Sequence, residues 1–221
     1  MAQLLFTARA GGVSNAKYAS LNLGDHVGDA ADLVAANREI IGNLVSQKRP
    51  VFMNQIHGDG VVEITDENNS PVTADAIVTK VKGLPLVVLV ADCLPILLTS
   101  SSVVGAVHAG RKGVLNGIIS KSVLAMRQLG ATDLKATIGP AICEECYEVD
   151  SEMYADAVAQ KPKLATTAHR HCLDLVNAVR FELEELEVEV SALKICTAHN
   201  ENYFSYRRDG QTGRSAGVVV L

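Results

Sequence analysis

The chain has 221 residues, of which 48% are hydrophobic and 20% charged. This composition is typical of a globular protein, excludes an intrinsically disordered one, and gives enough residues for one sizeable core. The formal net charge of -5 comes without a long basic stretch, which argues against binding to nucleic acid by phosphate neutralisation and against a basic helix on a membrane surface.

The N-terminus lacks the charged and apolar segments of a secretory signal peptide. The longest apolar stretch, at 84–91, contains a proline and is too short to span a bilayer. We therefore expect a cytoplasmic protein that does not bind a membrane. The five cysteines are then thiols or metal ligands, because disulfides are rare in the cytosol.

Apolar residues three and four apart predict three helices, at 31–46, 114–129 and 173–186. Asp29 is the expected N-cap of the first helix, and Gly130 the expected C-cap of the second. The polar segment 66–70 predicts a turn. Short apolar runs predict strands at 3–7, 51–53, 61–64, 76–79, 85–90, 96–99, 103–107, 134–138, 193–197 and 217–221.

Several of these strands are continuously apolar, which indicates sheets that are buried on both faces. The strands arrive in pairs between the helices, which favours mixed sheets over a simple alternating parallel array. No repeat, low-complexity tract or linker interrupts the chain. We therefore expect a single domain over residues 1–221, of the α+β class.

Two imidazoles and one thiolate, from His57, Cys93 and His108, form a natural ligand set for zinc. Cys93 and His108 lie at the ends of two neighbouring predicted strands, and strand ends are rigid supports for ligands. Asp92 and Asn54 are candidates for the hydrogen bonds that orient the ligands. Three protein ligands leave one position open for water or substrate, which points to catalysis.

Other interpretations of these residues remain open. A cysteine at a strand end is usually a small buried hydrophobe, and a histidine beside a glycine is usually a hydrogen-bonded loop residue. Alternatively, Cys93 is a thiolate nucleophile and His108 its base, in a cysteine hydrolase that needs no metal. That interpretation gives His57 no role.

A separate cysteine motif, Cys143-x-x-Cys146, is compatible with redox activity or with half of a zinc site. No second CxxC follows it, and two glutamates fill its interior, so we expect structural thiols. His26 and His199 have no comparable context and receive no role.

Two segments are suited to binding an anion. Residues 205–214 are Gly-rich and carry three arginines, whose forked guanidinium groups match phosphate oxygens. Residues 108–113 run into the second predicted helix, and a glycine-bracketed helix N-terminus with adjacent cations attracts anions. Solvated surface charges and an ordinary helix entry are the alternatives.

Ordered motifs run along nearly the whole chain, among them Gly12-Val13-Ser14, Gln55-Ile56-His57, Ala74-Asp75-Ala76, Ala91-Asp92-Cys93, His108-Ala109-Gly110, Ile138-Gly139-Pro140, Cys146-Tyr147-Glu148-Val149 and Thr212-Gly213-Arg214. Together they resemble the YfiH-type family, also called laccase-domain or multicopper-polyphenol-oxidase-like proteins.

The resemblance implies a layered α/β/β/α arrangement with mixed sheets. It implies zinc ligands that match His57, Cys93 and His108, with copper as the alternative metal. The implied activities are phosphorolysis of adenosine, inosine and methylthioadenosine, and adenosine deamination. Some members are described as copper-dependent phenol oxidases and others as peptidoglycan-editing factors, and the chain lacks the many histidines of a multicopper centre. Whether the chain acts alone or as a homodimer is left open.

On this resemblance the partners are a purine nucleoside and phosphate. The expected catalytic residues are Cys93, His108 and Arg38, and the expected substrate or phosphate ligands are Asn22, Lys112, Arg207 and Arg208. Asp75 is a candidate general acid for the leaving base. The family usually has Trp-Arg where this chain has Arg111-Lys112, so a planar fork is replaced by a point charge at that position.

Overall fold

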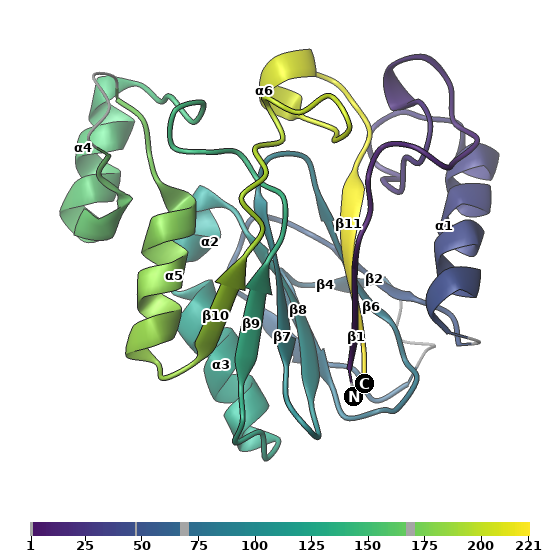
Figure 1. The fold of residues 1–221 in the computed structure, drawn as a ribbon, viewed down its shortest axis with the longest axis horizontal. Helices are drawn as coiled ribbons and strands as arrows, with labels where there is room; N and C mark the ends of the chain where they lie inside the picture. Colours follow the sequence, from purple (N-terminus) through teal and green to yellow (C-terminus); the bar gives the residue numbers. More distant parts are fainter. Residues whose placement is uncertain (1, 47, 67–70, 167–170) are drawn as a thin grey trace.

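Two β-sheets pack face to face between helices in the computed structural model, which describes residues 2–46, 48–66, 71–166 and 171–221 (Figure 1). The strand order of the first sheet is β1 (Gln3–Phe6), β11 (Ser215–Val220), β6 (Leu86–Val90), β2 (Val51–Asn54) and β4 (Val72–Thr73). The order of the second is β10 (Glu189–Ala192), β9 (Lys135–Ile138), β7 (Leu94–Thr99), β8 (Val104–Ala109), β5 (Ala76–Thr79) and β3 (Val61–Glu63).

Helices cover the outer face of each sheet. Helix α1 (Ala31–Val45) lies on the first sheet. The second sheet carries α2 (Arg111–Leu115), α3 (Ile118–Gln128) and α5 (Leu175–Glu185), with α4 (Ser151–Gln160) outside α5. Further helical turns are η1 (Ala16–Tyr18), η3 (Pro162–Leu164) and α6 (Tyr206–Asp209).

The side chains of β6 show why the central strands are apolar at every position. Val87 and Leu89 pack with α1, whereas Leu86 and Val88 point the other way, into the space between the sheets. On β7 the alternation is repeated, because Leu97 faces the first sheet and its neighbours face the helices. Burial on both faces and the α/β/β/α layering are thereby confirmed.

Both sheets are mixed, as predicted. In the first, β6 is antiparallel to β11 and parallel to β2. In the second, β7 is antiparallel to β8 and β9, while β9 is parallel to β10. The pairing of β1 with β11 places the strands near the two termini side by side in one sheet (Figure 1).

Two predicted elements differ from the structure. The helix expected at 114–129 is two helices, because Gly117 has a left-handed backbone with φ of 85° between α2 and α3. The strand expected at 193–197 is wrong: β10 ends at Ala192, and the following segment is a loop that touches Ala141 through an isolated bridge. The C-cap of α3 is Leu129 and not Gly130, which follows it with φ of 95°.

Helix α4 was not predicted. Asp150 caps it by accepting a hydrogen bond from the Met153 amide. Asp29 is not the N-cap of α1, because that position belongs to Ala30. The expected turn at 66–70 lies largely outside the described residues. Among the helices described, none has the length and apolar character needed to cross a bilayer.

Candidate functional site

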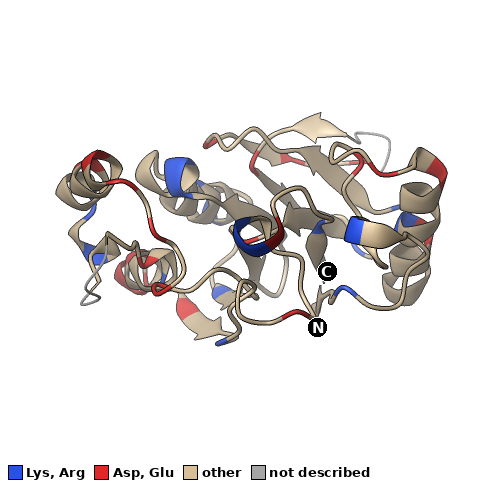
Figure 2. Ribbon diagram, turned by 90° about the horizontal axis from the view of Figure 1, so that it is seen from above, with Lys and Arg blue, Asp and Glu red and all other residues tan. Residues whose placement is uncertain are grey.

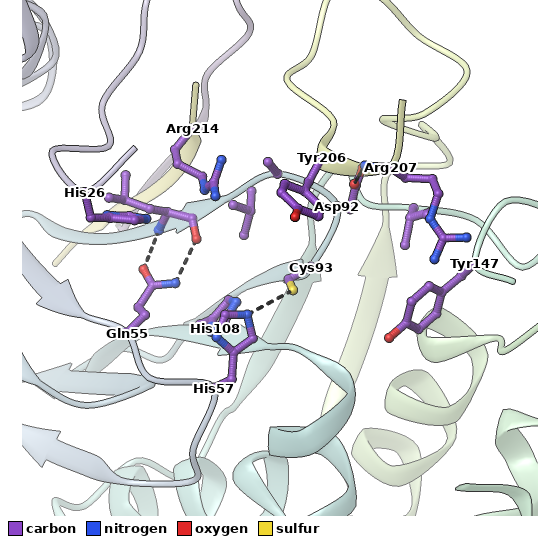
Figure 3. Close-up of a pocket in the computed structure, with 14 residues that line it drawn as sticks. His26, Gln55, His57, Asp92, Cys93, His108, Tyr147, Tyr206, Arg207 and Arg214 are labelled. Carbon is purple, nitrogen blue, oxygen red and sulfur yellow. Dashed lines mark hydrogen bonds between the residues drawn. The ribbon is translucent and has the colours of Figure 1, made fainter. Parts of the chain in front are cut away.

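Three residues from different parts of the chain converge in the pocket that Figure 3 shows. His57 lies in the loop after β2, Cys93 directly precedes β7, and His108 is on β8. One donor atom from each lies within 4.8 Å of the others. The Cys93 sulfur is 4.0 Å from His57 Nε2, and the two imidazole rings meet edge to face with centroids 4.7 Å apart. The structure thus brings together the three predicted ligands.

Asp75 orients the imidazole of His108 and holds the backbone of His57. Its carboxylate is fully buried, and Oδ1 accepts a hydrogen bond from His108 Nδ1 at 2.8 Å. The same carboxylate accepts the backbone N–H groups of His57 at 3.0 Å and of Gly58 at 2.7 Å. With Nδ1 engaged in this way, His108 presents Nε2 to the site, the arrangement found around metal-bound histidines.

These bonds argue against Asp75 as a general acid. Burial raises the pKa of its carboxyl, but the hydrogen bonds from His108 and from the loop of Gly58 outweigh burial and lower the pKa below its ordinary value. Asp75 is therefore a carboxylate with its oxygens occupied, and it has no proton to give to a leaving group.

Asp92 has a different role from the one expected. Its carboxylate accepts the Thr197 hydroxyl and the Arg207 backbone N–H, both at 2.7 Å, so it ties the loops around the site and does not orient a ligand. Asn54 is bonded to Thr73 instead. Asp92 and His57 both have positive φ, at 92° and 58°. Non-glycine residues keep such backbone conformations only where the surrounding structure enforces them, often at functional sites.

The charges at the site favour a thiolate. Burial raises the pKa of Cys93, but the adjacent His108 and His57 outweigh burial and lower the pKa to about 6. Burial lowers the pKa of His108, but Cys93 and Asp75 outweigh it and raise the pKa to about 9. At neutral pH Cys93 is therefore a thiolate and His108 an imidazolium. A metal cation can replace the imidazolium proton as the positive charge beside the thiolate.

Gly110 makes room for the cluster. A Cβ at this position would lie 3.1 Å from His57 Cδ2 and 3.2 Å from the Cys93 sulfur, which is tighter than ordinary van der Waals contact. The backbone of the β8–α2 turn therefore closes one side of the three donors. The donor set, its buried carboxylate and this close wall fit a zinc ion with three protein ligands and one open position.

The open side of the cluster faces a hollow of about 370 Å³. Besides Asp92, six further polar or aromatic side chains line it: His26, Gln55, Tyr147, Tyr206, Arg207 and Arg214 (Figure 3). Figure 2 looks onto this end of the molecule, with the blue turn of α6 near its centre. The volume and the mixture of aromatic and cationic groups suit a small polar ligand.

Only Arg207 of these six belongs to the predicted site residues. Its guanidinium lies 5.6 Å from the ring of Tyr147, and Nη1 donates to the carbonyls of Cys146 and Glu148 at 3.2 and 2.8 Å. The sequence did contain signals for others, because Gln55, Tyr147 and Arg214 stand in motifs of the family resemblance.

Arg214 enters the hollow beside a glycine. A Cβ on Gly24 would lie 2.7 Å from Arg214 Cγ, so only glycine leaves space for the arginine stem. Arg214 Nη1 donates to the carbonyls of Thr212 and Gly213 at 3.0 Å, which fixes the guanidinium. Gln55 is fixed as well, by two hydrogen bonds of 2.8 Å with the Leu89 backbone.

The other predicted substrate residues do not line this hollow in the described structure; they are Asn22, Arg38, Lys112 and Arg208. Asn22 is fully buried and bonded to Asp29. The Arg38 guanidinium stacks 4.0 Å from the Phe52 ring. It also donates to the Leu23 carbonyl and pairs with Asp25.

Arg208 and Lys112 also point elsewhere. Arg208 donates to the carbonyls of Thr197 and Tyr203 at 2.8 and 2.9 Å, so it holds the loops together from within. Lys112 is exposed on α2. Roles for these residues in substrate binding stay predictions.

Comparison with known proteins places this geometry in a family. The family model described as "Multi-copper polyphenol oxidoreductase laccase" matches residues 3–221. A purine nucleoside phosphorylase of Corynebacterium glutamicum is 42% identical, covering 98% of this chain and 93% of its own length. A purine nucleoside phosphorylase of Streptomyces coelicolor is 44% identical, covering 98% and 94%, and that of Escherichia coli named YfiH is 36% identical, covering 97% and 92%.

Solved structures agree with these relatives. The crystal structure of a Neisseria meningitidis protein has a TM-score of 0.91 at 33% identity, covering 100% of this chain and 94% of its own. That of YlmD from Geobacillus stearothermophilus has a TM-score of 0.87 at 30% identity, covering 99% and 91%. The chain therefore belongs to the multi-copper polyphenol oxidoreductase laccase family, as its resemblance to the YfiH-type proteins predicted.

Proposed function

We propose that the chain is a zinc-dependent purine nucleoside enzyme whose main reaction is phosphorolysis. The observation that carries this proposal is the position of the His57, Cys93 and His108 donors in a hollow that also holds two arginines and two tyrosines. The purine nucleoside phosphorylases among the relatives support it, because the chain matches them over nearly their full length.

Arg207 and Arg214 bind phosphate in this proposal. Both guanidinium groups line the hollow and both are held by backbone carbonyls, so they offset the charge of the anion without first having to be ordered. Tyr147 and Tyr206 offer flat apolar faces for the purine. Burial raises the pKa of Tyr147, so its hydroxyl keeps its proton at neutral pH and can donate a hydrogen bond to a ring nitrogen of the base.

In phosphorolysis a phosphate oxygen forms a bond to C1′ of the ribose while the bond from C1′ to the purine nitrogen breaks. The electron pair of the broken bond goes to the purine, which takes up a proton. Positive charge develops on the ribose in the transition state. The chain contributes by holding phosphate and nucleoside in line, and such positioning accounts for a large part of the barrier in many enzymes.

A zinc ion held by His57, Cys93 and His108 would supply a Lewis acid at this position in the hollow. Asp75 keeps His108 turned toward that position through the Nδ1 hydrogen bond. Adenosine deamination is a second reaction of the same hollow in this proposal. Water replaces the 6-amino group of adenosine and ammonia leaves, a reaction that other His/Cys zinc sites perform.

One observation favours a second candidate function. Cys93, with a pKa lowered to about 6, suits a nucleophile as well as a ligand. A cysteine hydrolase would use Cys93 with His108 and would need no metal. The zinc enzyme is the better proposal because it also uses His57, whose ring lies against His108 and whose backbone Asp75 holds.

The two functions are separated by chromatography of adenosine, inosine and methylthioadenosine after incubation with the purified protein, with and without phosphate. The proposal expects phosphate-dependent release of the base, which a chelator stops and zinc restores. Activity that survives the chelator but not alkylation of Cys93 would support the hydrolase. Parallel loading with copper determines which metal sustains turnover.

We also propose that residues 1–221 act as one unit in the cytoplasm. None of the five cysteines is in a disulfide, and thiols are maintained in a reducing compartment.

A further inference from the structure

Four side chains outside the hollow form a second cluster of metal-ligating groups: Cys143, Cys146, Cys196 and His199. One donor atom from each lies within 4.8 Å of all the others. The Cys146 sulfur is 3.0 Å from His199 Nε2, and the Cys143 sulfur is 3.9 Å from His199 Nδ1. The cluster has more donors than the first site, and none of them serves the function proposed above.

The cluster is made of two short loops with the same spacing. One loop is Cys143-x-x-Cys146, which follows β9, and the other is Cys196-x-x-His199, which follows β10. Each turns back on itself through a backbone bond, from the Cys146 amide to the Cys143 carbonyl in the first loop, and from the Asn200 amide to the Cys196 carbonyl in the second. Pairs of ligands with two residues between them on such turns are typical of structural zinc sites.

The sheet holds the two loops in register. Strands β9 and β10 are parallel neighbours, and the isolated bridge between Ala141 and Cys196 continues their pairing past the strand ends. The Ala141 amide donates to the Ile195 carbonyl and the Thr197 amide donates to the Ala141 carbonyl. The Cys143 amide also donates to the Cys196 sulfur at 3.4 Å, as backbone N–H groups do toward metal thiolates. The ligands are therefore positioned by backbone that the fold already fixes.

We propose that Cys143, Cys146, Cys196 and His199 bind a second zinc ion, in a structural site independent of the reaction. Three thiolates and one imidazole fill the four positions of a tetrahedral ion, so no position stays open for substrate. Soft sulfur ligands select zinc over magnesium or calcium. The first site, in contrast, has three ligands and an open side.

The position of this second site in the fold gives it a specific task. Arg207, in the wall of the hollow, donates to the carbonyl of the ligand Cys146. Asp92, next to Cys93, accepts from Thr197, which follows the ligand Cys196. The Asp92 carbonyl also accepts from the Ile142 amide, beside Cys143. Zinc at the second site would therefore fix the loops 143–146 and 196–199, which support Arg207 and Asp92 at the side of the hollow.

The test is the zinc content of the purified protein, measured by mass spectrometry of the metal against protein concentration. We expect two zinc ions per chain in the wild type, one in the double variant Cys143→Ser/Cys146→Ser, and one in Cys93→Ala. The matched control is Cys172→Ala, a buried cysteine outside both clusters, which keeps two.

Cobalt distinguishes the two sites. After replacement of zinc, the sulfur-to-cobalt charge-transfer band should persist strongly in Cys93→Ala, which retains three thiolate ligands. The band should weaken greatly in the double variant, which retains one. A wild type with a single zinc ion, lost entirely in Cys93→Ala, would overturn the proposal, as would an unchanged zinc content in the double variant.

A measurement on the wild type covers the case in which the double variant does not fold. Mapping of alkylated cysteines should find Cys143, Cys146 and Cys196 protected in the native protein and reactive after treatment with a chelator. A disulfide between two of them, or rapid alkylation before the chelator is added, contradicts the proposal. Because these readouts do not involve nucleosides, they are independent of the function proposed above.

Discussion

The two cysteine–histidine clusters differ in what prepares them for a metal. At the first, two imidazoles outweigh burial and lower the pKa of Cys93 to about 6, so the thiolate is present before any ion arrives. At the second, burial and the neighbouring thiols Cys143 and Cys196 raise the pKa of Cys146 to about 12. Among the residues that the structure describes, a buried carboxylate, that of Asp75, hydrogen-bonds a ligand only at the first site.

This difference shows how similar donors are suited to different tasks. A site with a ready thiolate, a fixed imidazole and an open side is prepared for exchange of water and substrate. A site in which burial keeps the thiol of Cys146 protonated until the ion binds couples metal binding to the loss of that proton. The comparison predicts that damage at the first site abolishes turnover, whereas damage at the second mainly loosens the structure around it.

The largest effect is expected from Cys93→Ala. Loss of the thiolate removes a ligand from the site with only three, so kcat/KM for adenosine should fall by about 10³-fold, equivalent to about 4 kcal/mol of transition-state stabilisation. Steady-state kinetics with phosphate and saturating zinc measure this. Full activity with full zinc content would remove Cys93 from the mechanism.

Asp75→Asn should have the next largest effect. An amide in place of the carboxylate weakens the hold on His108 and on the loop that carries His57, so zinc affinity at the first site should fall by about 10- to 100-fold. Competition with a coloured chelator measures this affinity. The second site provides the internal control, because its zinc should be released at the same chelator concentration as in the wild type.

Arg214→Ala tests the phosphate clamp and should raise the KM for phosphate by roughly 10-fold, as expected for the loss of one charge-assisted hydrogen bond. The KM for the nucleoside and the zinc content should change little. Initial rates at varied phosphate measure the effect. A rise confined to the nucleoside KM would assign Arg214 to the sugar or base instead.

Lys112→Arg should have the smallest effect. Lys112 is exposed on α2 and outside the lining of the hollow, so the change in the KM for phosphate should be less than about 2-fold, in keeping with the small energies of exposed charges. The same phosphate series measures it. A large loss would show that lysine at this position is an adaptation to another substrate.

The predicted fold class depended on properties that the sequence contains locally. Strands such as β6 and β7 are apolar at every position, and only burial on both faces explains that pattern. Local patterns failed where a tertiary contact decided the outcome. The apolar residues at 193–197 predicted a strand, but they form the loop that places Cys196 beside Ala141.

At the two metal-ligand clusters, too, some features followed from local sequence and others from tertiary contacts. The sequence determined His57, Cys93 and His108 as candidate ligands, because their residue types and motifs are local properties, and it supplied the family. Only the tertiary structure joined Cys143-x-x-Cys146 to Cys196-x-x-His199. Each motif alone supplies two ligands, and the parallel pairing of β9 with β10 brings the two motifs together. The structure likewise decided that Arg214 reaches the hollow while Arg38 stacks on Phe52. A side chain's direction depends on neighbours that are distant in sequence, so residue type alone could not give it.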